Sequence, residues 1–202
     1  MTDIKVKKRN GRLEEINLDK INKCVERACQ DLLEVSASEV VLDASLQLYN
    51  KITTSEIDKA LIMSARSKIE KEPNYSYVAA RMLLSNLYKE AFGQTVDSGM
   101  AHELCKTNFI KNIKLLVKQG LLDERMLEYD LELLSENIDI ERDKSFKYLG
   151  IQTLYDRYFI HIEGRRMETP QAFYMRVAMG LSLQEDNKEE KAIQFYNMMS
   201  NF

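Results

Sequence analysis

Apolar residues recur at spacings of three and four along most of the chain, and this helical period constrains the fold more than any other feature. The clearest repeat follows Asn17, a predicted N-cap, and consists of Leu18, Ile21, Val25, Ala28 and Leu32. Such a repeat places apolar side chains on one face of an α-helix. The 202 residues include only 7 Gly and 2 Pro, too few turn-forming residues for an all-β sandwich or barrel. A mainly α fold is therefore predicted.

Helix start signals divide this pattern into separate helices. Ser36 with Glu39, and Thr53 with Glu56, have the spacing of a capping box, in which two side chains satisfy free backbone donors of the first turn. Thr169-Pro170 combines a capping residue with proline at the first helical position. The predicted helices cover residues 37–49, 55–71, 101–119, 127–134 and 145–158, and others follow Asn17, Pro73, Thr169-Pro170 and Asp186-Asn187.

The first 20 residues depart from the helical period. Two short extended segments, Ile4 to Arg9 and Arg12 to Ile16, flank Asn10-Gly11. This dipeptide suits the type I′ turn of a β-hairpin, because both central residues of that turn need positive φ. The basic residues of the segment are Lys5, Lys7, Lys8, Arg9 and Arg12. Because the whole chain has a formal net charge of -3, the predicted hairpin is a local basic segment on an acidic protein.

A second, smaller hairpin is predicted around residue 163. The apolar run from Phe159 to Ile162 is followed by Glu163-Gly164-Arg165, a pattern typical of two short strands and a turn. The pair Arg165-Arg166 would lie in a solvated turn or would meet an acidic partner. We interpret it as a solvated turn.

Several function classes lack their sequence signals. The chain contains no GxSxG, no P-loop ending in GK[ST], no HExxH and no GxGxxG. Cys24, Cys29 and Cys105 form no CxxC pair, which argues against a zinc ribbon or a disulfide framework and indicates reduced thiols that are buried or half-buried. His102 and His161 lie far apart in the sequence, so no His-based metal site is predicted.

Charge and targeting signals indicate a cytoplasmic protein without membrane contact. The start of the chain lacks the apolar core of a signal peptide, and no stretch approaches the roughly 20 apolar residues of a membrane span. A slightly negative net charge gives no overall field that attracts nucleic acid. We interpret the last residues, Met198 to Phe202, which have no polar tail, as the end of a segment cut from a longer chain.

The basic hairpin is the strongest candidate for a binding function. Polyphosphates are bound by converging cations and by helix N-termini, whose free backbone donors favour anions. Residues 7–9 are basic on one predicted strand, Asn17 and Lys20 lie at the start of the next helix, and Thr53-Thr54-Ser55 begins another. A solvated, exposed hairpin accounts for the same residues, so spacing alone leaves both interpretations open.

Longer blocks of sequence resemble a known family. VKKRNGRLEEINLDKI (Val6 to Ile21), ITTSEID (Ile52 to Asp58) and PNYSYVAARMLLSNLYKEAFGQ (Pro73 to Gln94) resemble, in this order, the ATP-cone at the N-terminus of the large subunit of class I ribonucleotide reductases. IERDKSFKYLGIQTLYDRYFI (Ile140 to Ile160) and METPQAFYMRVAMGLSL (Met167 to Leu183) resemble the helical N-terminal domain that precedes the catalytic barrel. The blocks are ungapped and cover nearly the whole chain.

The resemblance implies both a fold and a regulatory task. The fold is a four-helix ATP-cone capped by a three-stranded β-sheet in residues 1–93, then a mostly helical domain with a short hairpin in residues 94–202. The task is overall-activity control, with ATP activating and dATP inhibiting, together with Mg²⁺. The full subunit, partnered by a radical-generating small subunit and assembled into a large-subunit oligomer, would reduce ribonucleoside diphosphates. The segment alone would be non-catalytic, because its cysteines match none of the family's catalytic ones.

The resemblance also implies a nucleotide site. By motif it assigns to the nucleotide Lys8, Arg9, Glu14, Asn17, Lys20, Ile21, Thr54, Asp58 and Lys89. The lysines and Arg9 would bind the phosphates, while Glu14 and Asn17 suit hydrogen bonds to base or sugar. Bacterial relatives often have His where this chain has Asp58. A carboxylate would repel the triphosphate, which implies a rearranged pocket or an altered response to dATP.

Two alternatives follow from this departure and from the cone itself. A degenerate cone that no longer binds nucleotide would serve as a scaffold or subunit contact, and Asp58 is the best support for it. A nucleotide-sensing transcription repressor can carry the same cone, but it needs a DNA-reading element, usually a zinc ribbon. The chain has neither paired CxxC motifs nor a positive net charge.

Overall fold

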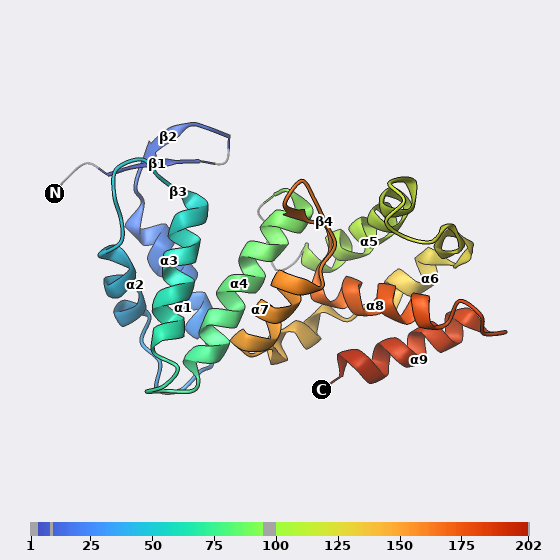
Figure 1. Cartoon of the computed structure of the whole chain (residues 1–202). Helices are drawn as coiled ribbons and strands as arrows, with labels where there is room; N and C mark the ends of the chain where they lie inside the picture. Colours follow the sequence, from blue (N-terminus) through green and yellow to red (C-terminus); the bar gives the residue numbers. More distant parts are fainter. Residues whose placement is uncertain (1–3, 9, 95–99, 202) are drawn as a thin grey trace. The chain divides into compact units, whose positions relative to one another are not determined.

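The computed structural model describes residues 4–8, 10–94 and 100–201 (Figure 1). Helices make up most of these residues, which confirms the mainly α prediction. The chain divides into two compact units. The first consists of Met1–Asn86 and Phe146–Gln152, and the second of Leu87–Ser145 and Thr153–Phe202.

The first unit begins with a three-stranded sheet in the order β2-β1-β3. β1 (Lys5–Lys7) pairs antiparallel with β2 (Leu13–Glu15) and parallel with β3 (Ile52–Thr53). Val6 and Ile52 are paired and buried, so one face of the sheet packs against the protein while Lys5 and Lys7 are exposed. Figure 1 shows the sheet at the ends of α1 and α3. The predicted hairpin and three-stranded cap are confirmed.

The hairpin loop is one residue longer than the predicted type I′ turn. Lys8 N–H donates to the Arg12 carbonyl at 2.8 Å, and Gly11 N–H donates to the Lys8 carbonyl at 2.9 Å. Lys8 and Arg12 are therefore the last pair before the loop. Gly11 has a φ of 82°, the left-handed conformation that ends a three-residue loop at a bulge. The glycine is needed for this position and not for the centre of a two-residue turn.

Four helices follow the sheet in the predicted order. They are α1 (Leu18–Cys29), α2 (Ala37–Ser45), α3 (Thr54–Ser67) and α4 (Tyr75–Phe92). Their fully buried residues include Val25, Val40, Ala65 and Val78. α2 and α3 end earlier than residues 49 and 71, where they were predicted to end, because the following backbone forms short-range turns, such as the hydrogen bond from Gln47 N–H to the Ala44 carbonyl. α4 continues from the first unit into the second.

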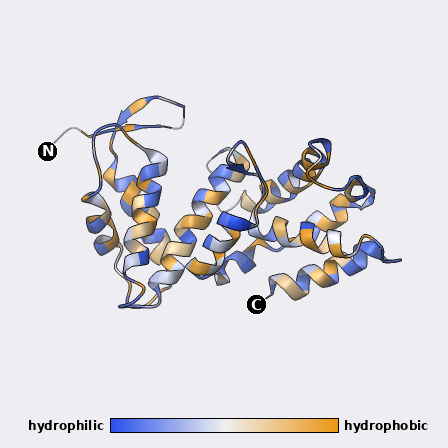
Figure 2. Ribbon diagram, viewed as in Figure 1, coloured by the Kyte–Doolittle hydropathy of each residue, from blue (hydrophilic) through white to orange (hydrophobic). Residues whose placement is uncertain are grey.

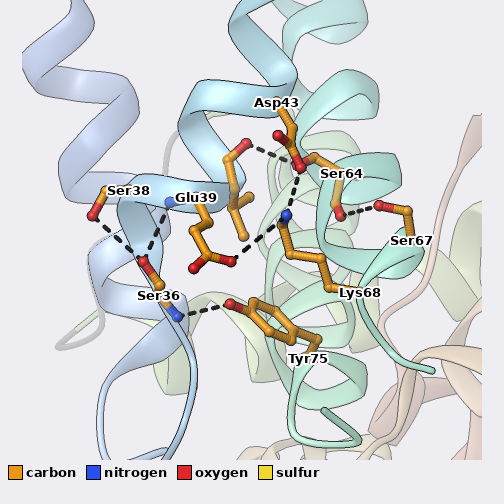
Figure 3. A network of polar contacts seen from close by, with 9 residues as sticks. Ser36, Ser38, Glu39, Asp43, Ser64, Ser67, Lys68 and Tyr75 are labelled. Carbon is orange, nitrogen blue, oxygen red and sulfur yellow. Dashed lines mark hydrogen bonds and ion pairs between the residues drawn. The ribbon is translucent and has the colours of Figure 1, made fainter. Parts of the chain in front are cut away.

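A polar network links α2, α3 and the start of α4 (Figure 3). Ser36 caps α2 as predicted, and its hydroxyl accepts from Glu39 N–H at 3.3 Å. The reciprocal half of the predicted capping box is wrong, because Ser36 N–H donates instead to the Tyr75 hydroxyl at 2.9 Å. The Glu39 carboxylate lies 3.8 Å from Lys68 Nζ, which also donates to Asp43 at 2.5 Å. Partners distant in sequence have replaced the local one.

The second unit is helical apart from one short hairpin. Its elements are α5 (Ala101–Lys118), the 3-10 helices η1 (Glu124–Glu128) and η2 (Ile140–Ser145), α6 (Leu131–Glu136), the end of α7 (Tyr148–Arg157), β4 (His161–Ile162), β5 (Arg165–Arg166), α8 (Pro170–Leu181) and α9 (Lys188–Ser200). The predicted helix at 127–134 is two elements, because Asp130 accepts from Leu133 N–H and starts a new helix. Residues 145–147, predicted to begin a helix, precede α7.

Apolar side chains from α5, α6, α8 and α9 form the core of this unit. Its buried members include Phe109, Leu134, Met175, Met179 and Tyr196. Figure 2 shows hydrophobic and hydrophilic residues alternating along α8 and α9, as expected of amphipathic helices. Among the described residues, none of the helices combines the length and apolar character needed to cross a membrane.

The second predicted hairpin is also confirmed, with β4 antiparallel to β5. Pro170 is at the start of α8 as predicted, but the Thr169 side chain does not cap that helix. The Thr169 hydroxyl lies 3.5 Å from Cys105 Sγ instead. Asn187 precedes α9 without a side-chain capping bond. At both helix starts the sequence located the boundary correctly, but the capping hydrogen bond is not formed.

Candidate functional site

Two helices of the first unit begin at the sheet. β3 leads directly into α3 at Thr54, and β2 leads into α1 through Ile16 and Asn17. β1 and β3 are parallel, with Lys7 opposite Thr53. The residues that follow, Lys8 and Thr54, therefore leave the sheet at the same end of the two strands. The fold thus brings a cationic side chain and a helix N-terminus together, an arrangement that favours an anion.

Lys8 and Glu14 form an ion pair on the inner face of the sheet. Glu14 lies opposite Val6, and Lys8 lies two residues beyond Val6, so all three share one face. Lys8 Nζ is 3.3 Å from Glu14 Oε2, and the side chains are 32% and 52% exposed. Pairs this exposed contribute only about 0–1 kcal/mol. A phosphate could therefore replace Glu14 as the partner of Lys8 at little cost.

Asn17 has a structural role at the start of α1. Its Oδ1 accepts from Lys20 N–H at 2.9 Å, which confirms the predicted N-cap. Because the amide oxygen is used in the cap, the group that Asn17 offers to a ligand is its NH₂. Lys20 is exposed and Ile21 is half-buried on the first turn of the same helix.

The start of α3 is fixed by a complete capping box. The Thr53 hydroxyl donates to Glu56 at 2.6 Å and Thr53 N–H donates at 2.8 Å, while Glu56 N–H donates back to the Thr53 hydroxyl at 3.2 Å. The Tyr49 hydroxyl adds a third bond to Glu56 at 2.9 Å. The Thr53 hydroxyl, followed by Thr53 N–H and Tyr49, lowers the pKa of Glu56 to about 2. Glu56 therefore stays ionised and holds this helix end at neutral pH.

The Tyr49 contact is a feature that the sequence did not reveal. The capping box is visible in the spacing of Thr53 and Glu56, but Tyr49 lies before β3 and reaches Glu56 only because the chain turns between them. Lys51, inside that turn, has a φ of 67°, a conformation uncommon for a residue other than glycine. No local sequence signal marks either residue.

The remaining predicted site residues are distributed unevenly. Thr54 and Asp58 are one turn apart on α3 and both are half-buried. Lys89 is half-buried near the end of α4, in the part of that helix that belongs to the second unit. Arg9 lies outside the described residues. A cavity of about 280 Å³ in the first unit is lined by other residues, including Ser36, Lys68 and Tyr75.

Comparison with known proteins assigns both parts of the chain. Residues 4–90 match the ATP cone domain, and residues 144–202 match the all-alpha domain of ribonucleotide reductase. The ribonucleoside-diphosphate reductase subunit alpha of Chlamydia pneumoniae is 40% identical over 199 residues. The chain belongs to the ribonucleotide reductase family. The protein of the same name from Helicobacter pylori is 40% identical over 201 residues. The ribonucleoside-diphosphate reductase 1 subunit alpha of Escherichia coli is 31% identical over 206 residues.

These relatives are much longer than the chain. Each alignment covers 98% of this chain but only 19% of the Chlamydia pneumoniae protein, 24% of the Helicobacter pylori protein and 26% of the Escherichia coli protein. The region compared therefore contains the cone and helical domains of the reductase, and only a minor part of each relative.

Cys29 and Cys105 are not activated thiols. Cys24 and Cys29 are half-buried and Cys105 is buried, all without disulfides, which confirms the predicted reduced thiols. Burial raises the pKa of Cys105 to about 12 and also raises the pKa of Cys29. Both therefore remain protonated at neutral pH and are poor nucleophiles. Among residues 4–8, 10–94 and 100–201, no group of three or more His, Cys, Asp or Glu side chains is arranged to hold a metal ion.

Proposed function

We propose that residues 1–93 bind ATP or dATP as an allosteric effector of a ribonucleotide reductase. The observation that carries this proposal is the parallel pairing of β1 with β3, which brings Lys8 to the N-terminus of α3. The match of residues 4–90 to the ATP cone domain supports it. Lys8 and the first backbone donors of α3 provide the two kinds of group that bind phosphate oxygens.

The proposed roles follow from the chemistry of each side chain. Lys8, Arg9, Lys20 and Lys89 bind the triphosphate, with Mg²⁺ brought by the nucleotide. Thr54 adds the helix N-terminus. Glu14, Asn17 and Ile21 contact the base and sugar: the Glu14 carboxylate accepts a hydrogen bond, the Asn17 amide donates one, and Ile21 offers apolar surface. Asp58 lies one turn into α3. It offers the ligand a hydrogen-bond acceptor at the position where bacterial relatives often have a histidine, which can donate.

ATP and dATP differ by one hydroxyl, so discrimination must come from a small free-energy difference. A ligand shifts a conformational equilibrium only through its different affinities for the two states. One hydrogen bond contributes about 0.5–1.5 kcal/mol, comparable with typical allosteric couplings of about 1–3 kcal/mol. The free energy of one contact to the 2′-OH is therefore large enough to change how the hairpin closes on α1 and α3, and so to separate the responses to ATP and dATP.

The whole protein, by this proposal, is a cytoplasmic ribonucleoside-diphosphate reductase that makes deoxyribonucleotides. Residues 1–93 form its nucleotide-binding domain and residues 94–202 its helical N-terminal domain. The rest of the large subunit carries the catalytic barrel. A small subunit supplies the radical, and oligomers of the large subunit respond to the effector.

The alternative function is a cone that has lost its nucleotide and serves as a scaffold or subunit contact. The observation that favours it is Asp58, because a carboxylate one turn from Thr54 opposes a triphosphate at the same helix N-terminus. The two functions differ in whether the cone binds ATP at all.

Calorimetry on the 202-residue chain tests the proposal. We expect binding of both ATP and dATP, with affinity reduced at least about tenfold in Lys8→Ala, the scale of a charge-assisted hydrogen bond. Lys7→Ala is the matched control. It removes the same charge from the preceding residue, the last of β1, whose side chain points to the opposite face. Absence of binding to the unmodified chain would leave the scaffold function instead.

A further inference from the structure

A groove of about 520 Å³ lies between α5 and α6. The two helices pack side by side in the second unit (Figure 1), so the groove lies within one compact part of the chain. Its lining includes Lys106, Ile110, Lys111 and Lys114 of α5 and Glu132 and Glu136 of α6. None of these residues is among those assigned to the nucleotide.

One lysine of the groove has a structural role. Lys106 Nζ donates to Glu136 at 2.6 Å and lies 3.7 Å from Glu103 Oε1. The Lys106 side chain is only 15% exposed, so it is held against the protein between these two carboxylates. The ion pairs join α6 to the first half of α5. Lys106 is therefore not available to a partner.

The lysines further along α5 have no such contacts. Lys111, Lys114 and Lys118 are exposed, and their spacings of three and four residues place them on one face of the helix. Over the described part of the chain, none of the three has an ion-pair or hydrogen-bond partner. Like charges at these spacings repel and disfavour the helix. An anion supplied from outside would relieve this repulsion.

Helix-end electrostatics account for only one of these cations. Lys118 is the last residue of α5, where the negative end of the helix dipole favours a positive charge. The effect is confined to the last turn of a helix, whereas Lys114 and Lys111 lie one and two turns earlier. These two lysines also line the groove. They are therefore placed to contact a molecule that lies in it.

The rest of the lining indicates which kind of anion fits. Ile110 lines the groove and packs against the core of the unit, so apolar surface lies beside the cations. A nucleic acid carries a phosphate at every nucleotide, which would oppose Glu132 and the net charge of -3. A peptide segment combines carboxylates for the lysines with apolar side chains for Ile110. The groove therefore suits an acidic segment of a protein.

We propose that this groove is a docking site for an acidic amphipathic helix of a partner protein. At 1.5 Å per residue, Lys111 and Lys118 are about 10 Å apart along the axis of α5. Carboxylates seven residues apart on a second helix have the same separation, with a third between them to face Lys114. The apolar face of that helix enters the groove beside Ile110, a common mode of helix recognition. This docking site does not depend on nucleotide binding.

The first experiment measures binding of a synthetic peptide to the 202-residue chain by fluorescence anisotropy. The peptide has about 15 residues, enough for a helix to form, with three glutamates spaced three and four residues apart and leucines on the adjoining face. We expect it to bind the chain, and to bind Lys111→Gln/Lys114→Gln about five- to tenfold more weakly, because two exposed ion pairs are lost. A peptide with glutamine at the three positions should bind both chains equally weakly. Absence of binding of the acidic peptide, or equal affinity for both chains, would overturn the proposal.

The matched control removes the same charge from the first unit. Lys23→Gln/Lys59→Gln replaces two exposed lysines, one on α1 and one on α3, and should bind the acidic peptide like the unmodified chain. Equal weakening in both double variants would show a response to net charge alone and would contradict a specific site. Thermal unfolding of Lys111→Gln/Lys114→Gln should occur at the same temperature or higher, since repulsion is removed. A lower temperature would assign these lysines to folding instead.

A second variant tests whether the peptide enters the groove. Thr107 is exposed and lines the groove, so Thr107→Trp fills it without changing the charge. We expect peptide affinity to fall about tenfold, as when one apolar side chain is excluded from a pocket. Thr107→Ser leaves the groove open and should bind the peptide normally. Unchanged affinity in Thr107→Trp would overturn docking in the groove.

Two measurements distinguish the proposed helix from other occupants. An oligothymidylate of similar length should compete poorly with the peptide. Equally strong competition that is lost in Lys111→Gln/Lys114→Gln would assign the lysines to nucleic acid and overturn the proposal. Sedimentation tests for a second copy of the chain, and we expect Thr107→Trp and the unmodified chain to sediment alike. A dimer of the unmodified chain that dissociates in Thr107→Trp would show that the groove binds another copy instead.

Discussion

The two β-hairpins are similar in size but differ in what their cations contact. In the first, Lys8 contacts Glu14 in an ion pair whose members are 32% and 52% exposed. In the second, Arg165 and Arg166 contact helix carbonyls, the Glu90 carboxylate and the Tyr155 ring. Both segments are basic in sequence, but Lys8 has an exposed carboxylate as its ion-pair partner, whereas Arg165 and Arg166 donate to backbone and side-chain groups of α4 and α7.

The difference shows that the role of a cationic side chain depends more on the group it contacts than on its position in a sequence motif. An exposed pair exchanges readily because its net contribution is small. Bonds to the carbonyls of a helix end are retained because those acceptors would otherwise need solvent. We therefore expect substitution of Glu168, which anchors the second hairpin, to change folding stability strongly, and substitution of Glu14, the partner of Lys8, to change it little.

The largest expected effect is on the anchor of the second hairpin. Glu168 is 4% exposed and Arg176 is 14% exposed, so Glu168→Ala leaves a largely buried cation without its carboxylate. Removing one partner of a buried pair costs about 3–5 kcal/mol, and we expect a loss of that size in the free energy of unfolding, measured by urea denaturation. Glu168→Gln is the control, because its amide oxygen still accepts a hydrogen bond. A loss below about 1 kcal/mol, the range of exposed pairs, would remove the contrast between the hairpins.

The next effect concerns the dependence of stability on pH. Burial raises the pKa of Asp143 to about 7, although Tyr88 and Gln171 both donate to it. The ordinary value is 3.8, so between about pH 4 and about pH 7 the folded protein binds more protons than the unfolded chain. Stability therefore falls as pH rises through this window, by at most about 1.4 kcal/mol for each pH unit.

Asp143→Asn tests this slope, because asparagine does not titrate. Urea denaturation at about pH 5 and about pH 8 should show a decrease in stability for the unmodified chain and a smaller decrease for the variant. Glu56, at the start of α3, shows the opposite dependence of stability on pH. The pKa of Glu56 is lowered from its ordinary value of 4.5 to about 2 by Thr53 and Tyr49, so its contribution is complete above about pH 4.5 and is lost as pH falls from there through about 2. Equal slopes in both chains would assign the pH dependence to other groups.

A smaller effect is expected at the start of α3. Thr53→Ala removes the hydroxyl that both donates to and accepts from Glu56, and loss of such a cap costs about 1 kcal/mol. Denaturation should show this loss, and Thr53→Ser should restore most of the stability. If Thr53→Ala leaves stability unchanged, the Tyr49 contact alone is enough to hold Glu56.

Local sequence signals predicted those elements whose causes are local. The Asn17 cap, the Thr53 box and Pro170 at the start of α8 depend on residues within one turn, and the structure places them where the sequence predicted. The Ser36 box and the Thr169 cap failed for a shared reason. In each, one polar group contacts a residue far along the chain, Tyr75 or Cys105, that no local pattern identifies.

The candidate site shows the same limit. The sequence indicates Lys8 and Thr54 as site residues separately. The parallel pairing that brings them to the same end of the sheet depends on β3, a strand of only two residues. A strand so short has no detectable alternation of polar and apolar residues. The interpretation of Arg165-Arg166 as a solvated turn is wrong, because both arginines contact groups of α4 or α7. The sequence could not show this, because the acceptors of Arg165, the carbonyls of Glu90 and Ala91, are backbone groups that exist at every position.

The smallest expected effect returns to the first hairpin. Glu14→Gln removes the charge that pairs with Lys8 and keeps a similar shape, and we expect the free energy of unfolding to change by less than about 0.5 kcal/mol, since exposed pairs contribute little. Whatever change remains should shrink as salt is added, because ions screen exposed charges. Urea denaturation at low and high salt measures both. A loss as large as that of Glu168→Ala would show that Lys8 is held as firmly as the hairpin arginines, and its charge would then not be available to a phosphate.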